Sequence, residues 1–157
     1  MPIIHVTTFV AAPVERVFDL SRSIDVHRHS MQKHKEQVVG DLFNGLLSKG
    51  SEVTWKAHHL FKTRVLKTKI TDYERPVSFV DEQITGDFLM MKHQHFFKPC
   101  DNGTIMIDIF QFETPYKIIG AFVNKIYLTG YMKTLLEERN KVIKETAEGN
   151  RWKNYLS

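Results

Sequence analysis

The stretch Met91-Lys-His-Gln-His-Phe-Phe-Lys-Pro-Cys-Asp-Asn-Gly-Thr-Ile-Met-Ile-Asp-Ile-Phe-Gln-Phe112 predicts a β-hairpin, and this hairpin decides the fold. Its centre, Asp101-Asn102-Gly103, is a turn signal of the kind that supplies the positive φ angle of tight hairpin loops. Folding the chain back at this turn sets a register in which His95 lies opposite Asp108.

One face of the predicted hairpin combines aromatic and ionisable side chains, because side chains alternate along a strand. The residues on this face are Met91, His93, His95, Phe97, Met106, Asp108, Phe110 and Phe112. A solvent-facing surface rarely holds so many aromatics, and an apolar core does not hold three ionisable groups. The face therefore indicates the wall of a cavity.

Composition indicates one compact domain over residues 1–157. The formal net charge is +4, with basic residues scattered among acidic ones, so we expect no nucleic-acid partner. The single Cys100 excludes an intramolecular disulfide and suits a reducing cytoplasm. The N-terminal residues are typical of a strand and not of a secretory signal, and we expect no integral membrane segment.

Hydrophobic periodicity predicts the other elements. Strands are expected over residues 3–11, 51–61, 62–72 and 77–85, two short helices near 13–21 and over 25–32, and a loop over 40–50. A long amphipathic helix is expected to end near Glu148, with an apolar stripe formed by Ile119, Phe122, Val123, Ile126, Tyr127, Tyr131, Leu135, Val142 and Ile143. Trp152 and Tyr155 in the tail could dock back on the body.

This order predicts an α+β fold in which a curved antiparallel sheet wraps around the C-terminal helix. Several segments carry a family resemblance: Ala12-Pro13-Val14-Glu15-Arg16-Val17-Phe18, Gly50-Ser-Glu-Val-Thr-Trp55, the stretch from Pro76 to Phe88, His93-Gln-His95-Phe96, Gly103-Thr-Ile-Met-Ile-Asp108, and Pro115 followed by Gly120 and Arg139-Asn140. With them the whole chain resembles the SRPBCC superfamily, the helix-grip domains of START, pollen-allergen-like and polyketide cyclase proteins, and especially a bacterial ligand-binding branch. Many members of that branch carry His-Phe-Gly where this chain reads His59-Leu60-Phe61.

The resemblance implies a hydrophobic cavity between sheet and helix that binds a small hydrophobic or aromatic molecule. It is also the reason to place Asp81 and Gln83 inward, since Val80 and Ile84 on the other face of the same strand are equally apolar candidates. The expected ligand-binding residues are Trp55, His59, Asp81, Gln83, His93, His95, Phe97, Asp108 and Phe110.

Two other kinds of chemistry stay open for the same cavity. His95 oriented by Asp108 could act as an acid–base pair in a cyclase- or dehydratase-like lyase or isomerase, or the two could be a structural hydrogen-bonded pair. His93 and His95 with Asp108, and His59 as a fourth group, could bind a metal, but His-x-His is common. We therefore expect neither metal nor cofactor.

A third class of function is protein interaction through the opposite hairpin face. That face carries an apolar stripe formed by Ile84, Phe96, Ile105, Ile107 and Ile109, which could support a homodimer if it is exposed. The structure can distinguish the two possibilities. If the histidine face of the hairpin meets the long helix, it forms a cavity wall and the apolar stripe is the candidate interface; if the apolar stripe meets the helix, the cavity assignment is inverted.

Overall fold

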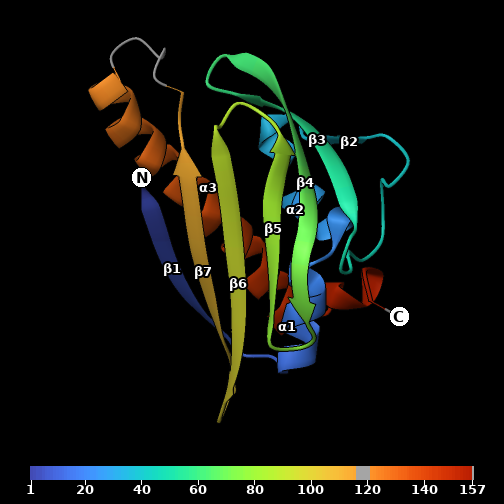
Figure 1. Cartoon of the computed structure of the whole chain (residues 1–157). Coiled ribbons are helices and arrows are strands. Elements are labelled where there is room, and N and C mark those ends of the chain that lie inside the picture. Colours follow the sequence, from blue (N-terminus) through green and yellow to red (C-terminus); the bar gives the residue numbers. More distant parts are fainter. Residues whose placement is uncertain (116–120, 157) are drawn as a thin grey trace.

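The structure, a computed structural model, describes residues 1–115 and 121–156, and the side chains of residues 121–125 lie outside this description. Its centre is a seven-stranded antiparallel sheet with the strand order β1-β7-β6-β5-β4-β3-β2 (Figure 1). The strands are β1 (Ile3–Val10), β2 (Gln37–Val39), β3 (Glu52–His59), β4 (Lys62–Glu74), β5 (Ser78–Thr85), β6 (Met90–Cys100) and β7 (Gly103–Glu113). Short β2, inside the segment that joins the second helix to β3, is the strand that periodicity did not predict.

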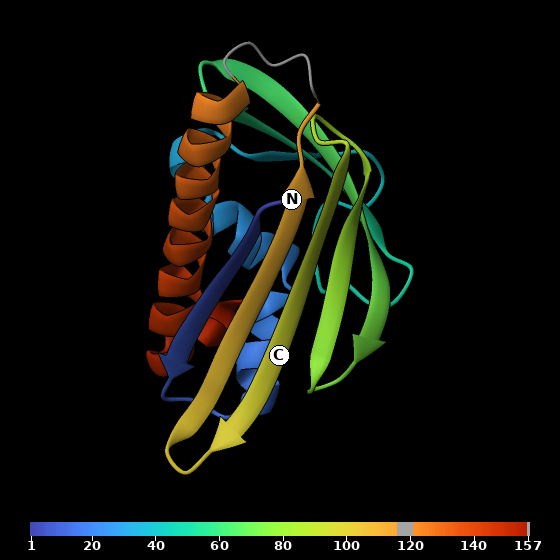
Figure 2. The same cartoon turned by 60° about the vertical axis from the view of Figure 1, so that its left-hand side comes forward.

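Three α-helices and two short 3-10 helices cover one side of this sheet (Figure 2). They are α1 (Val14–Ser21), α2 (Ile24–Ser30), η1 (Gln32–His34), α3 (Ala121–Glu148) and η2 (Arg151–Asn154). The Ser23 side chain caps α2 by accepting a hydrogen bond from the backbone N–H of Val26, as its sequence position predicts. The expected α+β helix-grip arrangement is confirmed. The second helix ends earlier than expected, because the chain tightens into η1 after Ser30.

The β6–β7 hairpin has the predicted register, with His95 opposite Asp108 and His93 opposite Phe110. Within the predicted turn signal the positive φ angle, 159°, belongs to Gly103, whereas Asp101 and Asn102 do not adopt one. Glycine is also required at position 103 because a Cβ atom there would lie 2.2 Å from the carbonyl oxygen of Val10. The close approach of β1 is therefore a second reason for this glycine, which the sequence did not indicate.

The β3–β4 connection is the turn with unusual backbone geometry. Leu60 and Phe61 join the paired residues His59 and Lys62, and their φ angles are 52° and 66°. Such left-handed angles are costly for bulky residues and usually occur at Gly or Asn. Phe61 is nevertheless 96% exposed at the tip of this turn.

The inward face of α3 differs from the predicted stripe. Ile126 and Tyr127 are exposed, whereas the buried described residues of the helix are Leu136, Arg139, Asn140, Ile143, Thr146 and Ala147. The helix is turned this way because two consecutive polar residues, Arg139 and Asn140, bond to groups inside the sheet. The predicted stripe members Ile119, Phe122 and Val123 fall outside the described residues or side chains.

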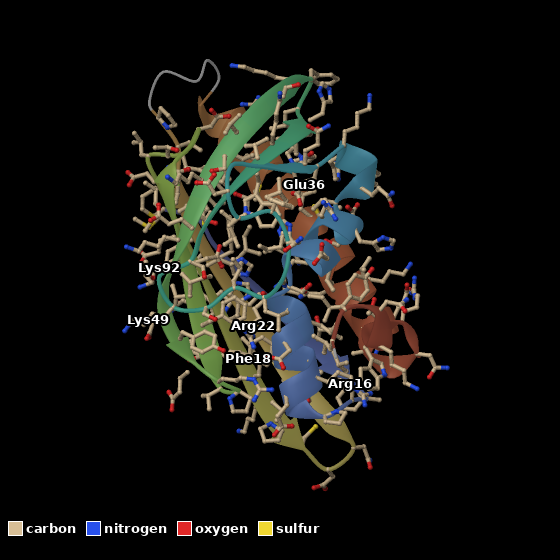
Figure 3. The ribbon with its side chains drawn as sticks, turned by 90° about the vertical axis from the view of Figure 1, so that its right-hand side faces the viewer. Arg16, Phe18, Arg22, Glu36, Lys49 and Lys92 are labelled. Carbon is tan, nitrogen blue, oxygen red and sulfur yellow. The ribbon has the colours of Figure 1, made fainter. Side chains whose placement is uncertain are left out.

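The core consists of two apolar clusters. The first surrounds Phe18 of α1 (Figure 3), whose ring meets those of Phe79 and Phe97 edge-on at 5.4 and 5.0 Å between centroids. Tyr155 and Trp152 of the tail pack against this cluster, and the guanidinium of Arg16 lies 4.0 Å from the centre of the Trp152 ring. The tail therefore docks on the body as the sequence indicates.

The second apolar cluster is formed by Ile4, Val6, Met91, Phe110, Phe112 and Leu136. Along β6 and β7, the residues between the two clusters are ionisable. We use the name polar layer for these residues and the α3 residues that bind them: His93, His95, Asp108, Arg139 and Asn140, all of them buried.

Candidate ligand-binding site

A cavity of about 180 Å³ lies beside the polar layer, between the sheet and α3. Most of its wall is apolar and includes Trp55, Ala57, Leu66, Phe79, Phe88, Met91, Phe110, Met132 and Leu135. Asp81 of β5 and His93, His95 and Arg139 of the polar layer contribute polar groups to the wall, and the other polar residues that line it are Ser21, Ser23, His27, Glu36, His59, Arg64 and Thr68. The predicted arrangement, with the histidine face of the hairpin towards the closing helix, is confirmed.

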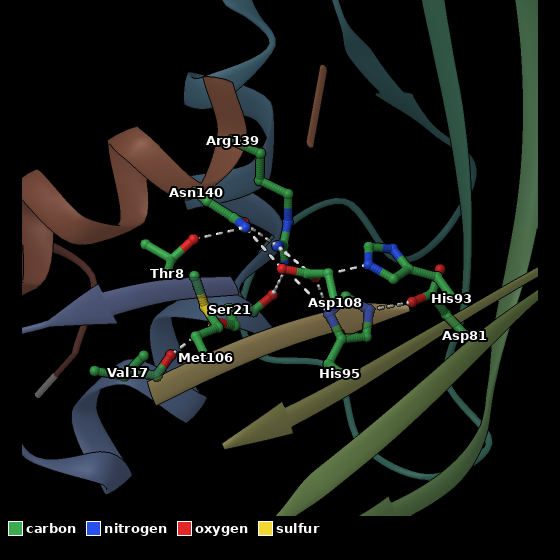
Figure 4. A network of polar contacts seen from close by, with 10 residues as sticks. All are labelled: Thr8, Val17, Ser21, Asp81, His93, His95, Met106, Asp108, Arg139 and Asn140. Carbon is green, nitrogen blue, oxygen red and sulfur yellow. Dashed lines mark hydrogen bonds and ion pairs between the residues drawn. The ribbon is translucent and has the colours of Figure 1, made fainter. Parts of the chain in front are cut away.

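Asp108 is the centre of the polar layer (Figure 4). Its side chain is fully buried; Oδ1 lies 2.7 Å from His93 Nε2, and Oδ2 accepts a hydrogen bond from Asn140 Nδ2 at 2.7 Å. Arg139 Nη1 lies 3.4 Å from Oδ1. Burial by itself would raise the pKa of the Asp108 carboxyl, but hydrogen bonds from His93 and His95 and the charge of Arg139 hold it well below its usual value.

His95 connects both carboxylates of this region. Its Nε2 lies 2.6 Å from Asp81 Oδ1, and its Nδ1 lies 3.4 Å from both Asp108 Oδ1 and Arg139 Nη2. The ring is stacked between Phe79, at 4.1 Å, and His93, at 3.7 Å between centroids. Burial would raise the pKa of Asp81, but its hydrogen bond with His95 holds that pKa below the usual value.

His93 has one ring nitrogen engaged and one free towards the cavity. Nε2 bonds to Asp108, and within residues 1–115 and 121–156 the structure gives Nδ1 no hydrogen-bond partner. Burial and the neighbouring His95 lower the pKa of His93 to about 4 despite the adjacent Asp108 carboxylate. The ring is therefore neutral at physiological pH, donating from Nε2 and presenting a lone pair at Nδ1.

The structure brings six of the nine expected ligand-binding residues to the cavity wall: Trp55, His59, Asp81, His93, His95 and Phe110. Asp108 does not line the cavity. The expected His95–Asp108 contact is present at 3.4 Å, but the His93–Asp108 and His95–Asp81 contacts, at 2.7 and 2.6 Å, are shorter. Phe97 belongs to the first apolar cluster instead. Gln83 donates a hydrogen bond to the carbonyl oxygen of Phe88, and the side chain does not line the cavity.

Arg139 and Asn140 are site residues that the sequence reasoning did not include. Arg139 donates to Asn140 Oδ1 at 2.8 Å and to the carbonyl oxygen of Ser21 at 3.2 Å, so it ties α3 to α1. The signal was present, because Leu135, Arg139 and Ile143 follow one another at the four-residue spacing of a single helix face. An apolar residue is expected on a helix face that packs against the sheet. An arginine at such a position indicates that its guanidinium binds a buried polar group.

A second, outer pocket of about 420 Å³ adjoins the cavity. The two share six wall residues: His59, Arg64, Leu66, Phe88, Met132 and Leu135. His59 Nδ1 lies 2.7 Å from the hydroxyl of Tyr131, and the His59 and His34 rings lie 4.8 Å apart. Burial, together with His34, lowers the pKa of His59. Apart from His59, Arg64, Asp87 and Thr114, aromatic and aliphatic residues line the outer pocket, among them the exposed Phe61 and Tyr127.

The outer sheet face carries the apolar stripe of Phe96, Ile105, Ile107 and Ile109, all half-buried, and the more exposed Ile84. This face lies opposite the cavity, as the alternation of the hairpin predicts. None of the helices in the described part of the chain is both long and apolar enough to cross a bilayer.

Comparison with known proteins identifies the fold. No family model and no curated protein sequence matches the chain. Solved structures that match include TTHA0849 from Thermus thermophilus (18% identity, TM-score 0.68, covering 90% of this chain and 97% of that one) and a START superfamily protein from Mycobacterium smegmatis (18%, 0.66, 93% and 97%).

A third match is the di-domain ARO/CYC protein StfQ of the steffimycin biosynthetic pathway, at 10% identity and a TM-score of 0.70. The match covers 93% of this chain and 50% of StfQ. At these identities the likeness concerns the backbone arrangement and not the ligands of those proteins. The chain has the helix-grip fold that START and ARO/CYC proteins of the SRPBCC superfamily share.

Proposed function

We propose that this protein binds a small hydrophobic or aromatic molecule that carries a polar group, in the cavity between the sheet and α3. The observation that supports this most directly is the uneven wall of the cavity. Apolar side chains line most of it, while Asp81, His93 and His95 lie together in one part of the wall. Ligand sites commonly combine a large apolar surface with a few polar groups that fix the orientation of the ligand.

The size and polarity of the cavity support a ligand that extends into the outer pocket. The inner cavity, about 180 Å³, holds only a small group, whereas the outer pocket adds about 420 Å³ of mainly apolar space. This polar part of the wall offers acceptors, namely His93 Nδ1 and the carboxylate of Asp81. A hydroxyl or amine on an aromatic or alicyclic body suits this wall.

The test uses the two tryptophans of the chain and the fluorescent probe 1-anilinonaphthalene-8-sulfonate. Trp55 lines the cavity, whereas Trp152 lies on the tail beneath Arg16 and serves as the matched control. Trp55→Ala should weaken probe binding about fivefold, because aromatic contacts contribute about 1 kcal/mol. Trp152→Ala should leave the probe affinity unchanged. Equal affinities in both variants, with near-UV circular dichroism showing intact packing, would contradict the proposal.

A second candidate is acid–base catalysis, and the geometry of His93 favours it. Asp108 fixes the ring through Nε2, while Nδ1 faces the cavity, as a general base requires. In this candidate the acid–base pair is His93–Asp108. Native mass spectrometry of the purified protein would identify a bound compound, and His93→Gln should then slow its conversion without changing its affinity. An unchanged rate in the variant would exclude this role.

The remaining parts of the proposal concern context. We propose that residues 1–157 act as one ligand-binding domain in the cytoplasm, where Cys100, exposed beside the hairpin turn, stays reduced. Association of two copies through the outer sheet face is a separate proposal. A monomer mass in analytical ultracentrifugation would refute that association and leave ligand binding untouched.

A further inference from the structure

The structure combines three metal-ligating side chains in one place. One ligand atom each from Asp81, His93 and His95 lies within 4.8 Å of the others, and no other such group of three occurs in the described residues. The sequence reasoning considered the two histidines with Asp108 and favoured no metal. In that alternative Asp108 was the carboxylate and His59 a possible fourth group, whereas Asp81 was expected in the cavity as a ligand-binding residue and not as part of a metal site.

Of the two nitrogens that do not face Asp108, His93 Nδ1 has no hydrogen-bond partner in the described residues, and His95 Nε2 is bonded to Asp81, the third member of the group. His93 Nε2 and His95 Nδ1 both face Oδ1 of Asp108, at 2.7 and 3.4 Å. The opposite nitrogens, His93 Nδ1 and His95 Nε2, are then on the side of Asp81 and the cavity (Figure 4). A metal-bound histidine typically donates its other N–H to a carboxylate in this manner. Asp108 is placed to serve both rings.

Charge and distance are also compatible with a cation. The region contains a half-buried carboxylate, Asp81, and a buried one, Asp108, and Arg139 is the guanidinium that faces them, so a cation there would lie among carboxylate oxygens. Ligand atoms about 2.1 Å from a tetrahedral metal are roughly 3.4 Å apart. In the structure the three ligand atoms lie within 4.8 Å of one another, and the His95 Nε2–Asp81 Oδ1 distance within this group is 2.6 Å.

We propose that Asp81, His93 and His95 form a binding site for a divalent first-row transition metal, with Asp108 orienting both imidazoles. Two imidazoles and one carboxylate suit Zn²⁺ or Fe²⁺. The remaining coordination positions face the cavity, because all three side chains line it. This inference goes beyond the proposed ligand binding and is independent of it, since it can be tested with the metal alone.

The test uses tag-free protein, freed of metal by a chelator and then titrated with Co²⁺ and Zn²⁺. The expected result is one equivalent of Co²⁺ with visible d–d absorption, displaced by Zn²⁺. Asp81→Asn should weaken Zn²⁺ binding by at least about 100-fold, and Asp108→Asn by about 10- to 100-fold. His34→Gln is the matched control, because His34 lies in the other histidine-rich cluster, beside His59 and Glu138. This control should bind like the wild type.

A measurement on the wild type makes the test independent of variant folding. Of the eight histidines, only the imidazole ¹⁵N resonances of His93 and His95 should shift when Zn²⁺ is added. Absence of uptake, or shifts confined to His34 and His59, overturns the proposal. Probe binding by the metal-free protein reports separately on the proposed ligand cavity.

Discussion

Replacing Asp108 by Asn should destabilise the protein strongly, because the carboxylate serves several donors at once. The amide can keep an oxygen towards His93, but its NH₂ group then faces Asn140 Nδ2, a donor that lay 2.7 Å from the lost oxygen. Asn140 cannot simply flip, because its own Oδ1 accepts from Arg139 at 2.8 Å. The guanidinium of Arg139 also loses its buried counterion.

Removing one partner of a buried ion pair costs about 3–5 kcal/mol in free energy of unfolding. For a chain of this length, 1 kcal/mol corresponds to roughly 2–4 °C in Tm, so a fall of about 6–20 °C is expected. Thermal and urea unfolding followed by circular dichroism would measure it, with the exposed Asp41→Asn as control. Adding Arg139→Met should recover part of the loss, because the unpaired charge is then removed. A loss below about 1 kcal/mol for Asp108→Asn would refute the reasoning.

Two further predictions concern the surface. Exchanging Leu60-Phe61 for Asn-Gly should raise the free energy of unfolding by about 1–2 kcal/mol, because both residues have left-handed φ angles; no gain in urea unfolding would contradict this. Burial would raise the pKa of Asp19, but hydrogen bonds from Arg75 and Arg22 hold it below 3.8. The ion pairs of Asp19 therefore stabilise the folded protein fully at pH values above the pKa that Asp19 has in the unfolded chain. This stabilisation is lost as the pH falls through the lower pKa that Asp19 has in the folded protein. Asp19→Asn should cost about 1–2 kcal/mol at pH 7 and almost nothing in strong acid, whereas a pH-independent difference would exclude the ion pairs as its cause.

The hairpin and its inward face could be predicted because they depend on local rules. Alternation along β6 and β7 fixed which side chains share a face, and the two-residue turn fixed that His95 lies opposite Asp108. Residues directly opposite each other are not always the residues that bond. Which histidine nitrogen reaches which carboxylate depends on side-chain torsions and on β5, whose register includes bulges against β4.

The helix α3 was harder to predict for a related reason. Its length and end follow from periodicity, but its rotation about its own axis depends on the partners of Arg139 and Asn140 in the sheet. The pattern of apolar residues along the helix predicts that Ile126 and Tyr127 face inward. The buried hydrogen bonds of Arg139 and Asn140 rotate the helix instead, so that Ile126 and Tyr127 are exposed. Long-range polar pairing of this kind cannot be derived from one segment alone.

The polar layer also has a consequence for how β6 and β7 align. A slip of β7 by two residues against β6 would keep every apolar side chain on the inward face, so the hydrophobic pattern by itself tolerates it. Such a slip moves Asp108 opposite His93 or Phe97 instead of His95, and away from the donors of Arg139 and Asn140. A carboxylate buried without those donors is costly. The polar layer thus selects one alignment of β6 and β7, which the hydrophobic pattern alone leaves open.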